Sequence, residues 1–449
     1  MEGFSFQPPA VDAAAAARYP ASVIIGKEAR FDADKGKNAT TAEAMTSTGH
    51  TVGVTFHLAY PPAVSHFCVH GPRLKREDFE GVPVVVSAQK DLVLLRLALT
   101  FGPRIPNGAS GSPDRVLHEY FVYEARCGMA SLKLIPVLHT KYEPMSTCIV
   151  PSDDGEFLIA AFLCTNHVFE EDRCIFSSKT GKWSSCERLE LKRPPEINYN
   201  DLPRRTDKVI VLGGGEVGLV DLRRGIRICN VMDADPVFRF VPLPKAEFLH
   251  DNDNWDDSQP IRDVVVCDGF IQLVEIDRRF RQVLGVNNKK KSCKKMTSDF
   301  DENTDIIYDS ETLDRSYARR ELIPVPDGWK IRTCYRHKSW DYWLKGHIVD
   351  VDGSFDYVPE LSDGGAGKYA LRDLATAYPA LSIVPSEDVV YLTSKVKSDD
   401  TKAWMVALHL RSKTLEVLGP YSASYFKRPR FLVSAFSEYL NTPPNQVPA

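Results

Sequence analysis

Short apolar runs separated by turn-forming residues dominate the hydrophobic pattern of the chain. In residues 226–231 the apolar side chains Ile226, Ile228 and Val231 recur at nearly every second position, which is typical of a β-strand. A second apolar run, residues 217–222, precedes this segment across an Arg-Arg-Gly turn. The two runs therefore predict a β-hairpin.

The same unit of strand, short polar turn and strand recurs along the chain. We predict it at residues 120–125 with 131–135, 174–176 with 183, 217–222 with 226–231, 270–276 with 280–284, and 405–410 with 415–418. Further strands are predicted at residues 22–25, 52–58, 65–70, 82–87 and 92–97. The first four turns follow one another at steps of roughly 45–55 residues, which is in the range of propeller blades. The pattern predicts an all-β fold, an irregular β-propeller-like array of six or seven blades.

Helical periodicity is weak throughout the sequence. One helical turn is expected near residues 42–45, and two short helices are expected at residues 369–377 and 433–440. We expect helix to account for less than about a fifth of the residues, below the average of globular proteins.

Composition divides the chain into regions. Residues 1–18 are rich in Ala and Pro and are expected to be disordered. An N-terminal β half is expected over residues 19–200 and a second β region over residues 201–360. Residues 361–449 are expected to form a closing β segment with a terminal helix.

The second β region contains a segment, residues 285–321, with a different composition. Residues 289–295 contain five lysines, and a block rich in aspartate and glutamate follows them. Adjacent blocks of opposite charge with few aliphatic residues predict a solvated, mobile insertion. A nuclear-import signal is an alternative interpretation of the lysines.

Charge and hydropathy limit the classes of function. The chain has a net charge of −4 at pH 7, which argues against nucleic acid as a partner of the whole chain. No run of about eighteen apolar residues is present, so no membrane span is expected. The first residues lack the pattern of a secretory signal, and the expected location is therefore the cytoplasm, the nucleus or both.

The ten cysteines include no C-x-x-C pair, which argues against a zinc knuckle. Cys164 and Cys229 lie inside apolar runs and are interpreted as small buried hydrophobic residues. In a reducing compartment we expect all of the cysteines to remain thiols.

Two segments resemble a dinucleotide-binding motif and a calcium-binding loop, but each lacks a feature that its motif requires. Gly213, Gly215 and Gly218 fit the dinucleotide fingerprint, but no helix can follow before Gly225. Residues 250–257 are rich in Asp and Asn, but an EF-hand loop beginning at Asp251 would need Gly at position 256 and Glu at position 262.

The remaining candidates for chemistry are isolated side chains. No G-x-S-x-G nucleophile elbow is present. His57, His66 and His118 stand apart in the sequence and are expected to be packed or surface residues. The sequence therefore assigns no catalytic, cofactor-binding or metal-binding residue, and no cofactor is expected.

One stretch, residues 332–343, interleaves aromatic and basic side chains. Tryptophan, tyrosine and arginine are enriched in protein-binding hot spots, and aromatic side chains beside cations also bind nucleic acids. The candidate partner-binding residues are Arg336, His337, Lys338, Trp340 and Trp343. The alternative is structural, with Trp329, Trp340 and Trp343 as strand anchors around a polar turn.

Several motifs are similar to those of a known family. The run G-L-V-D-L-R-R-G-I-R-I-C-N-V-M begins at Gly218 and is followed by P-L-P at residues 242–244. Further matches are Arg262-Asp263-Val-Val-Val-Cys-Asp-Gly-Phe-Ile, Gly328-Trp329-Lys330, Tyr378-Pro379-Ala-Leu-Ser and Ala403-Trp404. These motifs resemble the plant family labelled domain of unknown function 1618. Leu219 and Arg223 depart from it, because the family usually has tryptophan at both positions.

The resemblance covers nearly the whole chain, but it implies kinship without an activity. We therefore expect an uncharacterised intracellular plant protein that acts as a non-enzymatic adaptor for unidentified protein partners. The alternative is a hydrolase-type enzyme with two paired carboxylates in the channel of the propeller. The sequence gives no indication of the oligomeric state.

Overall fold

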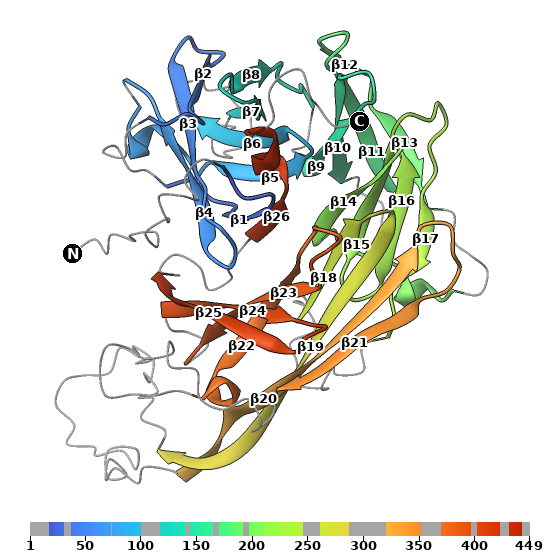
Figure 1. Cartoon of the computed structure of the whole chain (residues 1–449). Helices are drawn as coiled ribbons and strands as arrows, with labels where there is room; N and C mark the ends of the chain where they lie inside the picture. The colour runs from blue at the N-terminus through green and yellow to red at the C-terminus, as the bar shows by residue number, and fades with distance from the viewer. Residues whose placement is uncertain are drawn as a thin grey trace, which may run out of the picture.

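A computed structural model shows that the chain folds into six small β-sheets arranged as the blades of a propeller. Figure 1 shows the blades following one another in chain order. The structure describes residues 18–30, 37–72, 74–99, 117–140, 144–164, 170–191, 197–245, 261–286, 320–351, 370–396, 402–422 and 431–441. The predicted all-β propeller is confirmed, with six blades.

The blades are numbered in chain order, and their strands have the following bounds. Blade 1 contains β2 (Ala42–Met45), β3 (Thr51–His57), β4 (Val64–His70), β1 (Val23–Gly26) and β26 (Phe431–Ser434), in that order across the sheet. Blade 2 contains β5 (Val84–Gln89), β6 (Leu92–Leu99), β7 (Leu117–Glu124) and β8 (Ser131–Ile135). Blade 3 contains β9 (Pro144–Pro151), β10 (Phe157–Cys164), β11 (Glu170–Ser177), β12 (Lys182–Trp183) and β13 (Glu187–Glu190).

The second half of the ring is more regular. Blade 4 contains β14 (Lys208–Gly213), β15 (Glu216–Asp221), β16 (Gly225–Asn230) and β17 (Arg239–Pro242). Blade 5 contains β18 (Arg262–Cys267), β19 (Phe270–Val286), β20 (Arg320–His337) and β21 (Leu344–Val351). Blade 6 contains β22 (Ala375–Leu381), β23 (Val389–Lys395), β24 (Lys402–His409) and β25 (Thr414–Ser422).

One strand from each blade lines the centre of the ring. β5, β9, β14, β18, β22 and β26 each contact the corresponding strand of the next blade, so the six strands form a closed circle. Both ends of the described chain meet in blade 1, where β1 pairs with β4 in parallel and with β26 in antiparallel orientation. The innermost strand of the first blade is therefore supplied by residues close to the C-terminus.

Six apolar clusters hold the ring together, one between each pair of adjacent blades. The strands bury both faces, as β15 illustrates: Val217 and Leu219 pack towards blade 3, and Val220 packs towards blade 5. Strands buried on both faces have nearly continuous apolar sequences. This explains why the hydrophobic runs of the chain alternate only in part.

The short helices expected from the sequence are confirmed only in part. Residues 42–45 form a strand, and the described part of the predicted helix 369–377 contains a 3-10 turn, η3 (Leu371–Asp373), followed by the start of β22. Ala-rich segments have helical propensity, but pairing with a neighbouring strand overrides it. The segment 433–440 contains the end of β26 and the one α-helix of the described residues, α2 (Phe436–Tyr439). Two other 3-10 turns are η1 (Arg76–Asp78) and η2 (Tyr199–Asp201).

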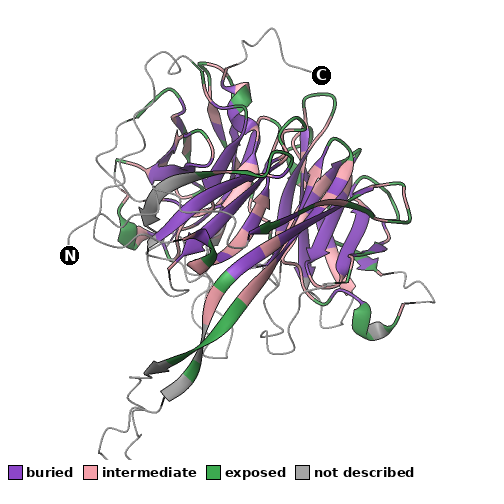
Figure 2. Cartoon of the chain, turned by 60° about the horizontal axis from the view of Figure 1, so that its bottom comes forward, coloured by how far each residue is buried: buried purple, intermediate pink, exposed green. Residues whose placement is uncertain are grey.

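The hairpin of β19 and β20 is longer than the sequence pattern predicted. A turn was predicted between strands 270–276 and 280–284, but β19 continues through it, with an irregularity in pairing between Arg278 and Phe280. That turn is wrong because β20 pairs with β19 on both sides of the irregularity. Figure 2 shows that the far part of this hairpin is exposed, whereas the blades are buried inside.

Several predicted segments lie outside the described residues. These are residues 1–17 of the predicted loose N-terminus, the Asp- and Asn-rich run 250–257, and residues 287–319 of the predicted insertion, including the lysines at 289–295. The side chain of Cys164 is also outside them. Cys229 is buried in the cluster between blades 3 and 4, as predicted.

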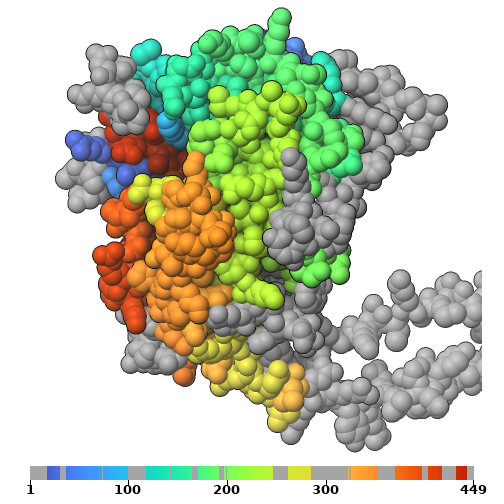
Figure 3. All heavy atoms as spheres, turned by 90° about the vertical axis from the view of Figure 1, so that its right-hand side faces the viewer, coloured from blue at the N-terminus to red at the C-terminus, as the bar shows by residue number. Residues whose placement is uncertain are grey.

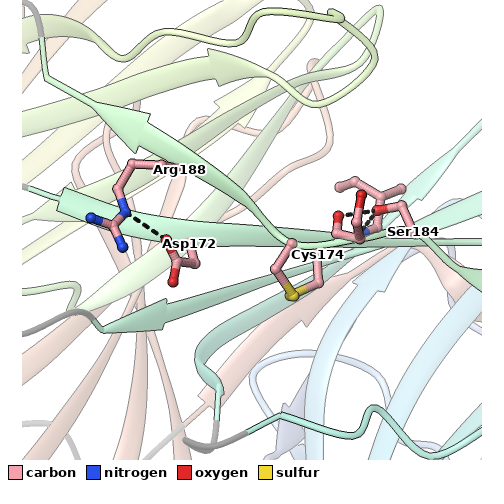
Figure 4. The surroundings of a disulfide bond; sticks show 7 residues. Asp172, Cys174, Ser184 and Arg188 are labelled. Carbon is pink, nitrogen blue, oxygen red and sulfur yellow. Dashed lines mark hydrogen bonds and ion pairs between the residues drawn. A yellow bond between two sulfur atoms is a disulfide. The ribbon is translucent and has the colours of Figure 1, made fainter.

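A disulfide in blade 3 corrects the expectation that every cysteine remains a thiol. Cys174 in β11 is bonded to Cys186, and their Cα atoms are 4.4 Å apart (Figure 4). β13 folds back onto β11, with Glu187 opposite Arg173, and this pairing brings Cys186 next to Cys174. The ion pair between Arg188 and Asp172, at 2.8 Å, fixes the same strand pair.

The disulfide can be tested by peptide mapping of protein that was alkylated without reduction. Trypsin should release residues 174–179 and 183–188 as one disulfide-linked pair, because Arg173, Lys179, Lys182 and Arg188 bound them. Reduction should then separate the two peptides. Recovery of both peptides in alkylated form before reduction would show that the two thiols are not bonded.

Candidate protein-binding site on blade 5

The connection between β20 and β21 lies at the end of blade 5 opposite the long hairpin. Arg336 is buried, and its guanidinium donates a hydrogen bond to the carbonyl oxygen of Trp340. Burial, together with the nearby Arg239 cation, holds the pKa of the Arg336 guanidinium below its usual range. Arg336 therefore fixes the conformation of the connection from the inside.

Two further residues of the connection attach it to blade 4. Lys338 Nζ lies 3.0 Å from a carboxylate oxygen of Glu216, the first residue of β15. The indole Nε1 of Trp343 donates to the carbonyl oxygen of Pro242 at 3.0 Å. The side chain of Trp343 also packs on the apolar cluster between blades 4 and 5. The connection is thus anchored at three points.

Five aromatic rings form a continuous cluster beside these anchors. The ring of Phe270 lies 6.2 Å from Tyr335, 5.4 Å from His337 and 5.6 Å from Trp340. Trp340 and Tyr342 are stacked, with their ring centres 5.0 Å apart. Leu344 lies opposite Tyr335 in the pairing of β20 with β21 and extends the surface. We call Phe270, Tyr335, His337, Trp340, Tyr342 and Leu344 the aromatic patch.

The aromatic patch is accessible to a partner. Tyr342 is 50% exposed, Leu344 37% and Tyr335 36%. Figure 3 shows the β20–β21 region, in orange, on the surface beside the yellow-green blade 4. The cations Arg239 and Lys338 and the acid Glu216 lie at its edge, whereas Arg336 is buried. Glu216 pairs with both cations, so the edge of the patch carries charges of both signs.

The structure separates the five candidate residues that the sequence grouped. His337 and Trp340 contribute rings to the aromatic patch, and Lys338 lies at its edge. Arg336 and Trp343 face the interior or blade 4. Trp329 is 1% exposed and belongs to the cluster between blades 5 and 6, far from this turn along β20.

Sequence reasoning missed four residues of the patch, and one of them, Leu344, directly follows the segment 332–343. Tyr335 and Tyr342 lie inside the segment that was singled out, and their aromatic character was the available signal. Phe270 is distant in sequence, and only the pairing of β19 with β20 places it opposite His337. Its proximity to His337 could have been inferred only with a known strand register.

The centre of the propeller forms a second candidate site. A cavity of about 420 Å3 is lined by residues from the inner strands of all six blades. Lys208 and Asp263 pair within its wall at 2.8 Å. Burial raises the pKa of the Asp207 carboxyl above its usual value, although hydrogen bonds from Leu222 and Arg205 oppose the shift. The cavity is therefore polar and has charged groups within it.

The structure also brings together two of the histidines that appeared isolated in the sequence. His57 and His66 are paired across β3 and β4, whereas His118 lies in β7 of blade 2. Cys68 belongs to the same group on β3 and β4. No other group of three potential metal ligands was found among the residues that the structure describes.

The glycines of the dinucleotide fingerprint lie in the hairpin of β14 and β15. Gly213, Gly214 and Gly215 have φ values of +83°, +62° and +81°, which a glycine adopts without strain. Gly218 lies within β15, where a Cβ atom would approach Ile226 to 2.8 Å. The predicted strands around the Arg-Arg-Gly turn are confirmed as β15 and β16.

The family-like motif at 218–232 has a structural explanation. The buried carboxylate of Asp221 accepts backbone N–H groups of Arg204 and Arg223 at 3.0 Å each, and so holds the turn between β15 and β16. At Gly225 a Cβ atom would meet the carbonyl oxygen of Val241 at 2.5 Å. The Asp and Gly of this motif are therefore required by the turn and by the packing of β17.

Among the residues that the structure describes, no helix has the length and apolar character needed to cross a membrane. None of the curated proteins matches the chain significantly. One similar solved structure is the crystal structure of the WD40 domain of SCAP from fission yeast. It is 11% identical, with 90% of this chain and 91% of that chain covered and a TM-score of 0.29. The propeller assignment rests on the sheets of the chain itself.

The model of one protein family matches a continuous part of the chain. The match extends from Val220 in β15 to Tyr391 in β23, and it includes blade 5 with its aromatic patch. It also includes the Asp221 and Gly225 positions of the turn described above. Residues 220–391 thus match the family described as protein of unknown function (DUF1618), as the sequence motifs indicated.

Proposed function

We propose that the chain is a non-enzymatic protein-interaction module that works inside plant cells, with the aromatic patch of blade 5 as its binding site. The observation that carries the proposal is a cluster of five contacting rings, partly exposed at the end of an anchored hairpin. The partner we propose is a protein segment that carries an apolar side chain beside acidic residues.

The side-chain types of the patch support this proposal. Hot spots of protein interfaces are enriched in aromatic residues and are surrounded by contacts that exclude water. The contacts of Lys338 with Glu216 and of Trp343 with Pro242 hold the site in place before a partner arrives. Such preorganisation reduces the loss of conformational entropy on binding. Arg239 and Lys338 at the edge can pair with acidic side chains of the partner, which accelerates its approach.

The test is affinity capture from a plant lysate, followed by binding measurements with each purified partner. Tyr342→Ala removes half of the stacked Trp340–Tyr342 pair, and Lys338→Glu reverses a charge at the edge. Each variant should reduce affinity for a patch-specific partner by roughly 10-fold or more, as expected for a hot-spot residue. The thermal midpoint should change little, because Tyr342 is half exposed.

Tyr60→Ala is the matched control, because Tyr60 is 46% exposed and lies in the β3–β4 connection of blade 1. It should leave the same partners bound. Binding through the patch should also weaken at higher salt, since the proposed partner is acidic. If Tyr342→Ala and Lys338→Glu capture the same partners with the same affinities as the unaltered chain, the proposed site is wrong.

A channel hydrolase is the second candidate, and the raised pKa of Asp207 in the central cavity favours it. A carboxyl with a raised pKa can act as a general acid, and cavities of this volume hold small substrates. The purified chain would then hydrolyse a member of a panel of glycosides and esters, and Asp207→Asn would abolish the activity. Absence of turnover across the panel would favour the interaction module.

A further inference from the structure

Two middle strands of blade 1, β3 and β4, place three potential metal ligands next to one another. His57 in β3 lies directly opposite His66 in β4, and Cys68 follows two residues later on the same face of β4. The two imidazole rings are stacked with their centres 4.8 Å apart and an interplanar angle of 15°. One ligand atom from each of the three residues lies within 4.8 Å of the others.

The two faces of this strand pair differ in chemistry. One face carries Phe56, Phe67 and Val69, which belong to the apolar cluster between blades 1 and 2. The opposite face carries Thr55, His57, His66, Cys68 and His70 in adjacent positions. Thr55 Oγ1 lies 2.9 Å from Nε2 of His70, so the polar row continues past Cys68. Thr55, His66 and Cys68 are buried, so this face holds nitrogen, oxygen and sulfur atoms inside the protein.

The ligand atoms match the preference of zinc. Zn2+ binds imidazole nitrogen and thiolate sulfur at about 2.0–2.3 Å, and tetrahedral coordination then separates the ligand atoms by roughly 3.3–3.8 Å. The ligand atoms lie within 4.8 Å of one another, so zinc binding requires the three side chains to turn until these atoms converge. Magnesium and calcium prefer oxygen ligands, which this group does not supply.

Burial indicates the type of zinc site. Cys68 is completely buried and His66 is 5% exposed, whereas His57 is only partly buried. Three protein ligands with an accessible side leave the fourth position for water. Cys68 also retains its thiol, because the disulfide of the described chain joins Cys174 to Cys186.

We propose that His57, His66 and Cys68 form a zinc-binding site on blade 1, with water as the fourth ligand. The site ties β3 to β4 beside the turn that contains Pro61 and Pro62. It is separate from the aromatic patch, which lies on blade 5. Each of the two proposals can therefore fail without the other.

The experiment uses the full chain after dialysis against a chelator, in a phosphine reductant that does not compete for metal. Titration calorimetry with Zn2+ should show one equivalent bound with a dissociation constant in the micromolar range or below. Co2+ in place of Zn2+ should give a thiolate-to-metal absorption band in the near ultraviolet. Affinity should fall as the pH drops through the usual histidine pKa of about 6.5, because the ligands must lose their protons.

Two variants and two controls assign the ligands. His57→Gln should weaken zinc binding at least 10-fold, and Cys68→Ser should also remove the near-ultraviolet band of Co2+. Cys229→Ser is the matched control for a buried thiol, and His347→Gln is the control for a half-exposed histidine. Both controls should bind zinc like the unaltered chain.

Two results would overturn the proposal. The first is failure of the unaltered chain to bind one equivalent of Zn2+. The second is zinc binding that survives both His57→Gln and Cys68→Ser, which would place the metal on other residues. If Cys68→Ser does not fold, zinc binding by His57→Gln decides the proposal. The side chain of His57 is partly exposed, so its replacement should be tolerated better than that of Cys68. Tyr342→Ala should bind zinc normally.

Discussion

Replacing Glu275 by alanine will lower the free energy of unfolding by about 3–5 kcal/mol. Glu275 is buried between two buried arginines and accepts hydrogen bonds from Nε of Arg262 at 2.8 Å and from Nη2 of Arg332 at 3.2 Å. Its removal leaves two guanidinium charges inside the protein without their counter-ion. Urea unfolding followed by tryptophan fluorescence measures the loss.

Two comparisons test whether the loss of stability comes from leaving the charges of Arg262 and Arg332 buried without Glu275. Glu43→Ala breaks an exposed ion pair with Lys37 and should cost less than about 1 kcal/mol. Replacing Arg262, Glu275 and Arg332 together by Met, Leu and Met should recover part of the stability. Recovery will be incomplete, because Arg262 also donates to the carbonyl oxygens of Leu222 and Pro244. A Glu275→Ala variant as stable as the unaltered chain would contradict the prediction.

Replacing Trp329 by alanine should cost about 3–5 kcal/mol, the usual range for a large buried aromatic side chain. Trp329 is 1% exposed and packs in the cluster between blades 5 and 6, which also contains Trp404. The deletion leaves a cavity that neighbouring strands cannot close, because each is held by its own blade. The same urea unfolding experiment detects this loss.

Trp329→Phe is the matched variant. It retains most of the apolar surface and removes an indole N–H that has no acceptor among the residues that the structure describes. We expect it to cost less than about 1.5 kcal/mol. Trp340→Ala should also cost less than Trp329→Ala, since Trp340 is only partly buried. Equal losses for Trp329→Ala and Trp340→Ala would show that burial at the blade contact is not the cause.

The class of fold could be predicted because strand pairs leave a local signal. The hairpin of β15 and β16 is visible as two apolar runs around Arg223, Arg224 and Gly225. The failures occurred where local pattern and long-range pairing disagree. Residues 277–279 have the polar composition of a turn, but the pairing of β19 with β20 continues through them. Likewise, the Ala-rich start of β22 becomes a strand because β23 lies beside it.

The candidate sites were harder to predict from the sequence than the fold. Arg336, His337 and Lys338 are consecutive and appeared equivalent, but alternation along β20 buries Arg336 and leaves its neighbours partly exposed. The group of His57, His66 and Cys68 depends on the register of β3 with β4, which spacing alone does not give. The disulfide likewise depends on the return of β13 to β11.

The motifs that indicated the family are largely structural in this chain. Asp221 and Gly225 shape a turn, Arg262 lies in the buried ion cluster, and Trp329 fills a blade contact. These residues therefore report how blades 4 and 5 are assembled. The residues of the aromatic patch, apart from Phe270, lie outside the motifs that carried the resemblance.

The closure of blade 1 has a consequence for synthesis on the ribosome. β4 ends at His70, but β26, which completes the inner edge of the same blade, begins at Phe431. At translation rates of about 5–20 residues per second, roughly 20–70 s separate the synthesis of the two strands. During this interval β1 presents an unpaired edge, which is a template for association with other chains. The nascent protein is therefore exposed to aggregation until β26 emerges, and shielding by chaperones would matter most at this stage.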